Sequence, residues 1–384
     1  MRIVRERAIA GRTPGQGALY PSFPPVDRNL FSIRLANKVS NALPLVSVVI
    51  PVRNESEFIA RVLKSILTQD YPSDFVEVIV ADGESDDDTK CVVEQLNRDH
   101  PNIQLISNPE KVVSYALNYA IVEARGEIII RMDAHSFYPQ NYISRLVFEL
   151  NRLEAGNVGG VLLTLPANEG LIATGISMAI SHPLGIGDSS FRLKNDRIKE
   201  VDTVPFGCFR RTLFDEIGLF DTDLIRNQDD EFNGRIIKNG GKIYLIPDVE
   251  IKYFARKTVS SLTKMFYQYG LFKPLVNKKL GTPATLRQFV PPLFVLFLLA
   301  AVLLPFIPLV GTWAWVCCLA LYISLVGGVA LGLALKQRRP ALVLIIPFLF
   351  PLIHLSYGWG YIKGFFIVYV LQGKPGRGDF PISR

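Results

Sequence analysis

The sequence predicts an α/β protein in which a doubly wound, mixed sheet is followed by a helical membrane region. Three observations support this prediction. Short runs rich in Val and Ile alternate with helical apolar stripes over residues 45–132, acidic residues stand directly after two of these runs, and residues 289–371 are mostly apolar. Strands that alternate with helices are typical of doubly wound sheets, and long uncharged segments are typical of membrane helices.

The individual strands and helices follow from the apolar periodicity. Uninterrupted runs of Val and Ile are typical of parallel strands that are buried on both faces. A helical stripe is visible at Phe58, Val62 and Ile66, which recur every four positions. We therefore predict strands at residues 45–51, 76–81, 103–107 and 127–132, and helices at residues 57–69, 86–96 and 112–124.

Three apolar segments predict the membrane region. Residues near 289–310, 313–335 and 341–371 contain almost no charge, and each supplies the roughly 20 apolar residues that a bilayer crossing needs. Buried helices of a soluble protein explain them less well, because three such runs in succession leave no polar face. The third segment exceeds one crossing and contains Gly358, Gly360 and Lys363. It is interpreted as one span plus an interfacial or re-entrant piece, which leaves the side of the carboxyl terminus open.

The charged link Lys336-Gln337-Arg338-Arg339 predicts the orientation. Short loops rich in Lys and Arg stay on the cytoplasmic side of a membrane. Two spans precede this loop, so the amino-terminal domain lies on the same side as the loop. We therefore expect a multi-pass protein of the cell inner membrane with a cytoplasmic catalytic domain. The expected domains are a flexible basic tail without a signal peptide at 1–44, a catalytic domain at 45–275 and a membrane region at 276–384.

The net charge of +7 indicates a membrane partner rather than nucleic acid. The basic residues are scattered and no nucleic-acid-binding motif accompanies them, so attraction to anionic lipids is the simpler explanation. The cysteines form no disulfide framework, because two are isolated in the soluble part and two are adjacent in an apolar segment. We expect reduced thiols at Cys91, Cys208, Cys317 and Cys318.

Three acidic clusters predict a single crevice. The clusters at Asp82 and Asp133 follow predicted strands, and the third is Asp229-Asp230-Glu231. Ligands of open α/β sheets bind outside the carboxyl ends of the strands, where residues from neighbouring strands meet. Taken alone, Asp82 is equally well explained as the cap of an ordinary strand-to-helix turn.

The clusters at Asp82 and Asp133 belong to a set of four motifs that occur in a characteristic order. They are the loop from Pro51 to Glu55, Asp82-Gly83 with Ser85 and Asp86, Asn118, and Arg131-Met132-Asp133-Ala134-His135. In these motifs the sequence resembles the family 2 glycosyltransferases of the GT-A fold. The last motif is most similar to that of the succinoglycan-type exopolysaccharide glucosyltransferases. The resemblance covers about residues 45–275.

The resemblance implies a nucleotide-sugar donor, here a UDP-sugar. Asp82 would contact the base, for which a carboxylate is suited because it accepts a hydrogen bond from an N–H on the base edge. The loop at residues 51–55 would surround the nucleoside. The donor-binding residues that the resemblance implies are Pro51, Arg53, Glu55, Asp82, Gly83, Lys111 and Asp133.

Asp133 and His135 occupy the position of the family's Asp-x-Asp motif, which implies a divalent cation, Mn²⁺ or Mg²⁺. Residues two apart on an extended segment point to the same side. Imidazole suits Mn²⁺ better than Mg²⁺, which prefers oxygen ligands, so the His in place of the second Asp favours manganese. A lone His is otherwise more often a hydrogen-bonded structural residue.

The segment from Gln228 to Arg235 is similar to the family's Glu-Asp-x-Asp-Leu-x-x-Arg motif, with Gln228 in place of the leading Glu. The resemblance places the catalytic base at Asp229. This carboxylate would accept the proton of the acceptor hydroxyl and thereby give inversion at the anomeric carbon. The adjacent Asp230 is a rival that the sequence does not separate from Asp229, and a solvated acidic helix start is the non-catalytic explanation.

Gly207, Cys208 and Gln268 are expected on the acceptor side. Gly207 and Cys208 stand in a stretch that is similar to the family's acceptor-side stretch, and a glycine permits close backbone approach. Cys208 is not expected as a nucleophile, because inversion needs no covalent intermediate. Gln268 lies in a loose match to the Gln-x-x-Arg-Trp signature of processive synthases. It is equally well explained as part of a basic stretch near lipid phosphates with Lys264, Lys273, Lys278 and Lys279.

Together these features predict an inverting glycosyltransferase. It would move a hexose, glucose by resemblance, from a UDP-sugar to a polyprenyl-diphosphate-linked saccharide in exopolysaccharide biosynthesis, while held among membrane lipids. A processive polysaccharide synthase is the alternative within the family, and three spans are few for a polymer channel. A non-catalytic membrane scaffold with an inactive nucleotide-sugar domain is the alternative outside it, supported by Gln228 and His135.

Overall fold

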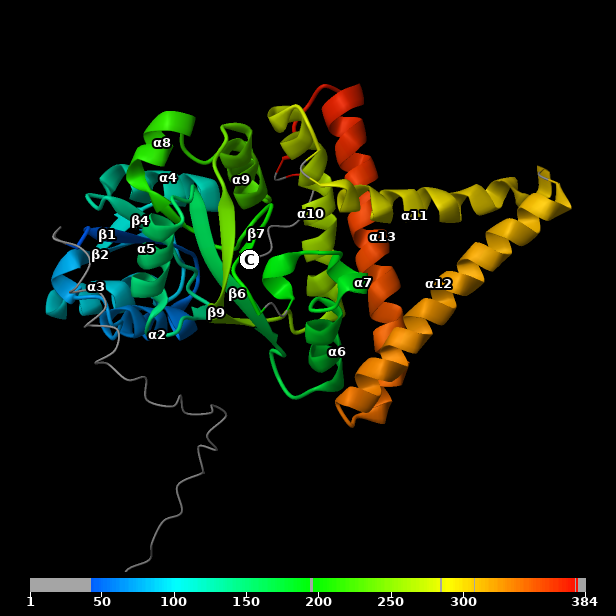
Figure 1. Cartoon of the computed structure of the whole chain (residues 1–384), viewed down its shortest axis with the longest axis horizontal. Helices are drawn as coiled ribbons and strands as arrows, with labels where there is room; N and C mark the ends of the chain where they lie inside the picture. Colours follow the sequence, from blue (N-terminus) through cyan, green and yellow to red (C-terminus); the bar gives the residue numbers. More distant parts are fainter. Residues whose placement is uncertain (1–42, 194–195, 284, 307, 377, 379–384) are drawn as a thin grey trace, which may run out of the picture. The chain divides into compact units, whose positions relative to one another are not determined.

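The computed structural model describes residues 43–193, 196–283, 285–306, 308–376 and 378 of the chain. Apart from its last two residues, the predicted tail at 1–44 lies outside these ranges. In the described part, nine strands form one sheet in the order β3-β2-β1-β4-β8-β6-β9-β5, with β7 paired to β9 (Figure 1).

The first half of the sheet is parallel, as the sequence predicts. Strand β1 lies between β2 and β4, and β3 extends the sheet beyond β2. The strands are fully or nearly fully buried except for β3, and this explains why their Val and Ile runs show no polar alternation. The elements are β1 (Val46–Val52), α2 (Ser56–Leu67), β2 (Val76–Asp82), α3 (Thr89–Asp99), β3 (Ile103–Ser107), α4 (Val113–Glu123) and β4 (Ile128–Arg131).

The second half of the sheet is mixed. Strand β8 is antiparallel to β4 and β6, β6 is parallel to β9, and β9 also pairs with the short strands β5 and β7 in antiparallel directions. The elements of this half are β5 (Ser136–Phe137), α5 (Tyr142–Arg152), β6 (Asn157–Leu165), α6 (Leu171–Ala179), α7 (Pro183–Ile186), β7 (Lys199–Glu200), β8 (Cys208–Arg210), α8 (Arg211–Ile217), α9 (Gln228–Lys238) and β9 (Ile243–Phe254).

A cluster of aromatic rings fixes α9 to the sheet. Phe232 on α9 is fully buried and lies 5.4 Å from the ring of Phe209 on β8, 5.1 Å from Phe214 and 4.6 Å from Phe220, measured between ring centroids. Burying such side chains contributes about 1.5–3 kcal/mol each. The first turn of α9, which carries Asp229 and Asp230, is therefore held against the centre of the sheet.

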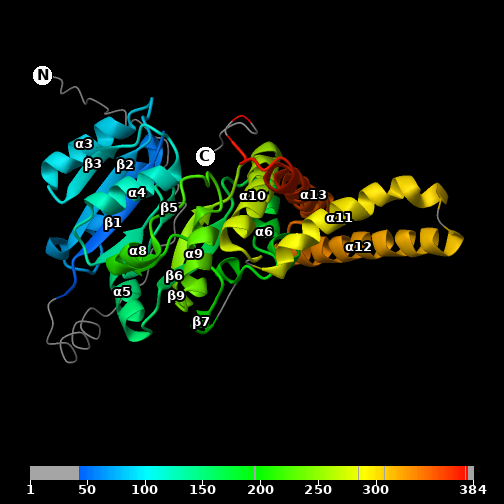
Figure 2. The same cartoon turned by 90° about the horizontal axis from the view of Figure 1, so that it is seen from above.

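Three segments near the carboxyl end are long and apolar enough to cross a membrane: Leu286–Leu304, Leu309–Lys336 and Pro340–Val370. They match the predicted segments closely. The first contains α11 (Val290–Leu299), the second is α12, and the third contains α13 (Ile346–Phe365). Both views show α11 and α12 running out from the sheet domain as a hairpin, whereas α13 lies along α10 (Figures 1 and 2). All four cysteines are free thiols.

The helix α10 (Val259–Leu280) makes the most extensive helix–helix contact of the described chain with α13. Glycines allow the two backbones to approach closely. A Cβ built at Gly270 would lie 2.0 Å from the carbonyl oxygen of Tyr357, and one at Gly360 would lie 2.2 Å from that of Tyr267. The predicted basic stretch that contains Lys264, Lys273, Lys278 and Lys279 therefore belongs to a helix packed closely against α13.

We expect Gly270→Ala to lower the free energy of unfolding by about 1–3 kcal/mol, because an added methyl group overpacks the α10–α13 contact. Thermal unfolding in lipid nanodiscs measures the effect. Gly327→Ala on α12 is the matched control, since nothing lies within 4 Å of its Cβ position. Equal melting temperatures for the two variants would show that α10 and α13 are not packed in this way.

Candidate active site

A cavity of about 620 Å³ lies between the sheet domain and the membrane helices. Its polar lining includes Arg131 at the end of β4, Asp133 and His135 just after it, and Asp229 and Asp230 from α9. Its lining also includes residues of α7, α10, α11, α12 and α13, most of them apolar or aromatic, such as Leu184, Phe266, Phe294, Tyr322, Ile353 and Tyr357. The acidic motifs of the sequence and the membrane helices thus share one cavity.

Arg131 joins two of the acidic motifs. Its Nε and Nη2 atoms lie 3.3 and 3.2 Å from Oδ1 of Asp133, and Nη1 donates to Oδ1 of Asp229. The residue is only 5 % exposed. Burial acts to lower the pKa of Arg131, but the carboxylates of Asp133 and Asp229 outweigh it and raise the pKa. Arg131 is therefore a permanent cation that fixes the spacing of the two carboxylates.

The adjacent acids Asp229 and Asp230 have different partners. Asp229 faces Arg131, whereas Oδ2 of Asp230 lies 2.7 Å from Nζ of Lys273 on α10. They belong to the first turn of α9, whose N-cap, Asn227, has a left-handed backbone with φ of 62° and donates from Nδ2 to the carbonyl of Tyr269. Carboxylates are favourable at this positive end of a helix.

The environment of Asp229 raises the pKa of its carboxyl group. Loss of hydration by burial is the largest cause, and the nearby charges of Asp133 and Asp230 act in the same direction, while Arg131 opposes them. The side chain is 32 % exposed, but it faces the cavity rather than the outer surface. A raised pKa makes a carboxylate a stronger base for a hydroxyl proton once it is ionised.

The predicted nucleoside-binding residues gather at the carboxyl ends of β1 and β2. Asp82 accepts hydrogen bonds from the backbone N–H and the hydroxyl of Ser85, at 3.0 and 2.5 Å, and lies 3.6 Å from Nζ of Lys90. Ser85 also accepts a bond from the backbone N–H of Asn54. These contacts fold the loop after Pro51 onto the turn after β2, so that a Cβ built at Gly83 would lie 3.4 Å from Cβ of Arg53.

Two further contacts involve this loop and the neighbouring turn after β2. Nδ1 of His135 lies 3.6 Å from Oε1 of Glu55, which brings the end of the nucleoside loop to the edge of the cavity. Lys111 pairs with Glu84 at 2.6 Å, on the turn after β2. Both pairs join segments that are far apart in sequence at one edge of the sheet, where the sequence predicts a single crevice.

Asp133 and His135 stand at the predicted metal position. Asp133 and His135 both line the cavity, on the same side of the segment after β4. Within the described ranges no group of three or more His, Cys, Asp or Glu side chains is arranged to hold a metal ion. A cation held by two protein ligands needs the remaining ligands from water and phosphate oxygens, which is how Mg²⁺ is usually bound in nucleotide enzymes. The donor set fits a cation that arrives with a diphosphate.

The three predicted acceptor-side residues lie behind the cavity wall. Gly207 has a positive φ of 88°, and its carbonyl accepts a bond from the backbone N–H of Arg131. Cys208 is fully buried in β8, where burial raises the pKa of its thiol, and this argues against a nucleophilic role. Gln268 is buried and accepts from Nε of Arg226 at 3.0 Å. Their chain neighbours Pro205, Phe206 and Tyr269 line the cavity instead.

A set of cations in the cavity was not predicted as part of the site. Lys273 was assigned to a basic stretch near lipid, and the other residues had no assigned role. Only Arg131 had a recognisable signal, because alternation along the strand end places it on the same side as Asp133. The lining cations are Arg131, Arg192, Arg226, Arg256, Lys273 and Arg287. A cavity with this charge suits an anionic ligand such as a diphosphate.

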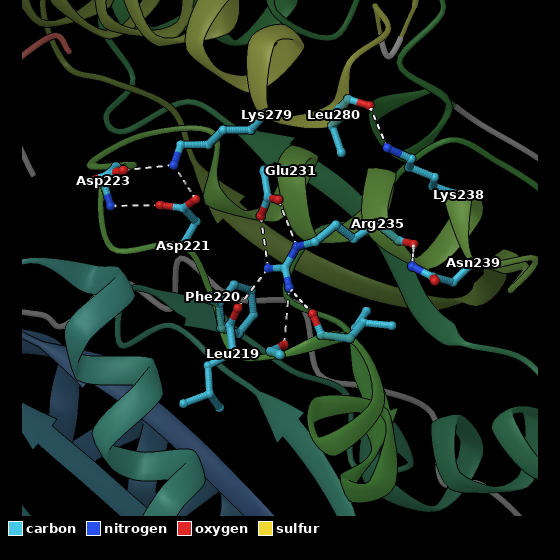
Figure 3. A network of polar contacts seen from close by, with 12 residues as sticks. Leu219, Phe220, Asp221, Asp223, Glu231, Arg235, Lys238, Asn239, Lys279 and Leu280 are labelled. Carbon is cyan, nitrogen blue, oxygen red and sulfur yellow. Dashed lines mark hydrogen bonds and ion pairs between the residues drawn. The ribbon is translucent and has the colours of Figure 1, made fainter. Parts of the chain in front are cut away.

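A polar network of residues outside the cavity lining holds α9 in place (Figure 3). Arg235 pairs with Glu231 one turn earlier and donates to the carbonyls of Ile217, Gly218 and Leu219. Lys279 at the end of α10 binds both Asp221 and Asp223, at 2.5 and 2.8 Å. The helix that carries Asp229 is thus connected to the preceding loop, and that loop is connected to α10.

The comparisons with known proteins point to one family. The profile described as glycosyl transferase family 2 matches residues 47–218. A dolichyl N-acetyl-alpha-D-glucosaminyl phosphate 3-beta-D-2,3-diacetamido-2,3-dideoxy-beta-D-glucuronosyltransferase of Methanococcus voltae is 30% identical over 327 residues, 83% of this chain and 96% of the relative. The succinoglycan biosynthesis protein ExoA of Rhizobium meliloti is 28% identical over 300 residues, 76% of this chain and 87% of the relative.

A solved structure supports the fold. The mannosyltransferase PcManGT of Pyrobaculum calidifontis, in complex with GDP-Man and Mn²⁺, superposes with a TM-score of 0.53 at 20% sequence identity. The match covers 86% of this chain and 94% of that protein. At this identity the similarity establishes the GT-A-like arrangement of the sheet domain, in agreement with the predicted fold class.

Proposed function

Because this chain belongs to glycosyltransferase family 2, we propose that it transfers a hexose, specifically glucose, from a UDP-sugar to a polyprenyl-diphosphate-linked saccharide. The family was inferred above from four motifs and is confirmed. The sugar, the nucleotide and the exopolysaccharide product are our proposals. One relative's name supports a lipid-linked acceptor, since it names a dolichyl-phosphate-linked sugar, and another's supports the exopolysaccharide product, since it names a succinoglycan biosynthesis protein.

The observation that supports this proposal most directly is the composition of the cavity. Its lining combines Asp133, Asp229 and several cations with apolar side chains of the membrane helices. A lipid-linked acceptor has the same combination, with a charged diphosphate and sugar attached to an apolar tail. The tail would stay among the helices near Phe294 and Ile353 while the sugar hydroxyl reaches Asp229. The charged loop at 336–339 supports a cytoplasmic position for the sheet domain.

The mechanism assigns separate tasks to the residues of the cavity. Asp229 accepts the proton of the acceptor hydroxyl as the oxygen attacks the anomeric carbon, and attack opposite the leaving group inverts its configuration. Lys273 holds Asp230, and Arg131 keeps Asp229 and Asp133 at a fixed separation. A divalent cation bound at Asp133 and His135 would neutralise the charge that develops on the departing diphosphate.

Release of nucleoside diphosphate from a panel of nucleotide sugars tests the proposal. The full chain is assayed in native membranes with lipid extract, with Mn²⁺ and with a chelator. We expect UDP release from UDP-glucose that requires the metal and vanishes in Asp133→Asn. Release of nucleoside diphosphate from a different nucleotide sugar would show that the transferred sugar is not glucose. No release from any donor, with Asp133→Asn indistinguishable from the unchanged protein, would favour the non-catalytic scaffold.

The raised pKa of Asp229 predicts the pH dependence of turnover. The base must be ionised, so kcat falls as the pH falls through the pKa of Asp229, and burial places this limb above the ordinary Asp value of 3.8. A pH profile of kcat at saturating donor measures the limb, and donor binding over the same range controls for loss of the fold. A rate that stays constant down to pH 4 would show that Asp229 is not the base.

A further inference from the structure

The segment that contains α13 touches the sheet domain at both of its ends. Before α13, Nη1 of Arg339 lies 3.3 Å from the carbonyl oxygen of Glu169 and 3.5 Å from the hydroxyl of Thr174. Glu169 stands just before α6, and Thr174 belongs to it. After α13, Nζ of Lys374 lies 2.8 Å from Oδ2 of Asp223, in the loop before α9. These two places are the opposite ends of a segment of 31 residues, Pro340–Val370.

The contacts continue along the length between these ends. Near the start, a Cβ at Gly175 on α6 would lie 3.1 Å from a methyl group of Leu349. In the middle, Nε2 of His354 lies 2.7 Å from the carbonyl oxygen of Leu184. Towards the end, Asn277 on α10 donates to the hydroxyl of Tyr361 at 3.2 Å. Thus α13 is attached to α6, α7 and α10 in turn.

A helix that crossed the bilayer could not make these contacts. At 1.5 Å per residue, a helix of this length rises about 45 Å, and its ends would stand on opposite sides of a hydrocarbon layer about 30 Å thick. The sheet domain would then have to extend through the bilayer beside it. That domain carries charged side chains and irregular loops, which the hydrocarbon does not accommodate.

The distribution of exposed side chains indicates what covers the outer face of α13. Its inner face is buried against the rest of the chain, as at Phe350 and Ile353. On the outer side of the segment Pro340–Val370, exposed apolar side chains form a stripe whose members repeat at intervals of 4, 11, 7 and 4 residues, all close to whole helical turns. The stripe, with exposed fractions in parentheses, consists of Leu344 (74 %), Phe348 (68 %), Trp359 (54 %), Phe366 (51 %) and Val370 (57 %).

We infer that α13 lies along the membrane surface with this stripe in the lipid, so that only the α11–α12 hairpin crosses the bilayer. The lipid surface is the partner because the stripe is continuous with a hairpin whose outer residues are also exposed and apolar, such as Leu293 and Leu321. Basic residues at both ends, among them Arg338 and Lys374, suit lipid phosphates. Lys374, which follows α13, then lies on the same side of the membrane as the sheet domain.

This inference also explains why hydropathy identified α13 as a candidate span. A surface helix normally has one polar face because water covers it. The inner face of α13 is covered by protein and its outer face by lipid. Both faces are therefore apolar, and the composition becomes that of a spanning helix.

Cysteine labelling of the full chain in sealed native membrane vesicles tests which side the two ends of α13 occupy. In a background in which the four native cysteines are replaced, Gln337→Cys and Gln372→Cys each introduce one exposed thiol before or after α13. A variant that retains only Cys91 marks the side of the sheet domain. We expect a membrane-impermeant maleimide to label all three from the same side. Labelling of Gln372→Cys from the opposite side would overturn the inference.

Depth-dependent quenching of Trp fluorescence tests the position of the helix itself. Phe replaces Trp313 and Trp315, which leaves Trp359 near the middle of the segment. In the matched control all three are Phe and Leu321→Trp marks the middle of α12. We expect headgroup-proximal spin-labelled lipids to quench Trp359 several-fold more than bilayer-centre labels, and the reverse for the control. Deep quenching of Trp359 would identify a span, and protection from both probes would indicate cover by protein; either result overturns the inference.

Discussion

Asp229→Asn is expected to reduce kcat by about 10²–10⁴-fold, the usual contribution of a positioned general base. Asn has nearly the same shape but does not accept the proton of the acceptor hydroxyl. Donor binding should change little, because Asp133 and the nucleoside loop remain. The rate of sugar transfer to extracted lipid acceptor, measured at saturating donor, gives the effect.

The neighbouring acid provides the matched control for this variant. Asp230 pairs with Lys273 at 2.7 Å and is expected to position α10 rather than to take a proton. Asp230→Asn should therefore retain most of the turnover and should keep the acid limb of the pH profile. The opposite ranking of the two variants would assign the base to Asp230, the alternative that the sequence left open.

Arg131→Met is expected to lower the free energy of unfolding by about 3 kcal/mol, the lower end of the range for breaking a buried ion pair. The substitution leaves the carboxylates of Asp133 and Asp229 close together without a cation. Chemical unfolding in nanodiscs measures the loss. Turnover should also fall, because both carboxylates would favour protonation.

Two further variants separate this effect from general damage. Lys242→Met breaks an exposed pair with Glu200 and should cost less than about 1 kcal/mol. Asp229→Asn combined with Arg131→Met should be less destabilised than the sum of the two single changes, since one of the repelling charges is gone. Additive losses would mean that Arg131 contributes by packing alone.

The parallel half of the fold could be predicted because nearly all residues of β1, β2 and β4 share one buried environment. These strands are buried on both faces, and their Val and Ile runs are therefore unbroken. The other half offers no such signal. Strands β5 and β7 have two residues each, β8 has three, and the pairing of β6 with β9 shifts register between Gly160 and Val161. Such short strands depend on long-range pairing rather than on local pattern.

The acids of the site could be predicted, whereas their partners could not. Asp133 and Asp229 stand in recognisable motifs, but the Arg131–Asp229 pair joins residues 98 positions apart. Lys273 shows the limit most clearly. In the sequence it belongs to a run of lysines near an apolar segment, and in the folded chain it is 8 % exposed and bound to Asp230. Only the packing of α10 against α9 distinguishes the two environments.

The close packing of α10 determines how this enzyme can be divided. The boundary expected near residue 275 falls within α10, which ends at Leu280. One face of this helix carries Lys273 to Asp230, and Gly270 on the same helix fits against the backbone of α13. A fragment that stops at the boundary would lose both the end of α10 and its neighbour. The catalytic part consequently cannot be exchanged as an independent domain. Chimaeras with a different membrane region should take α10 and α13 from the same protein.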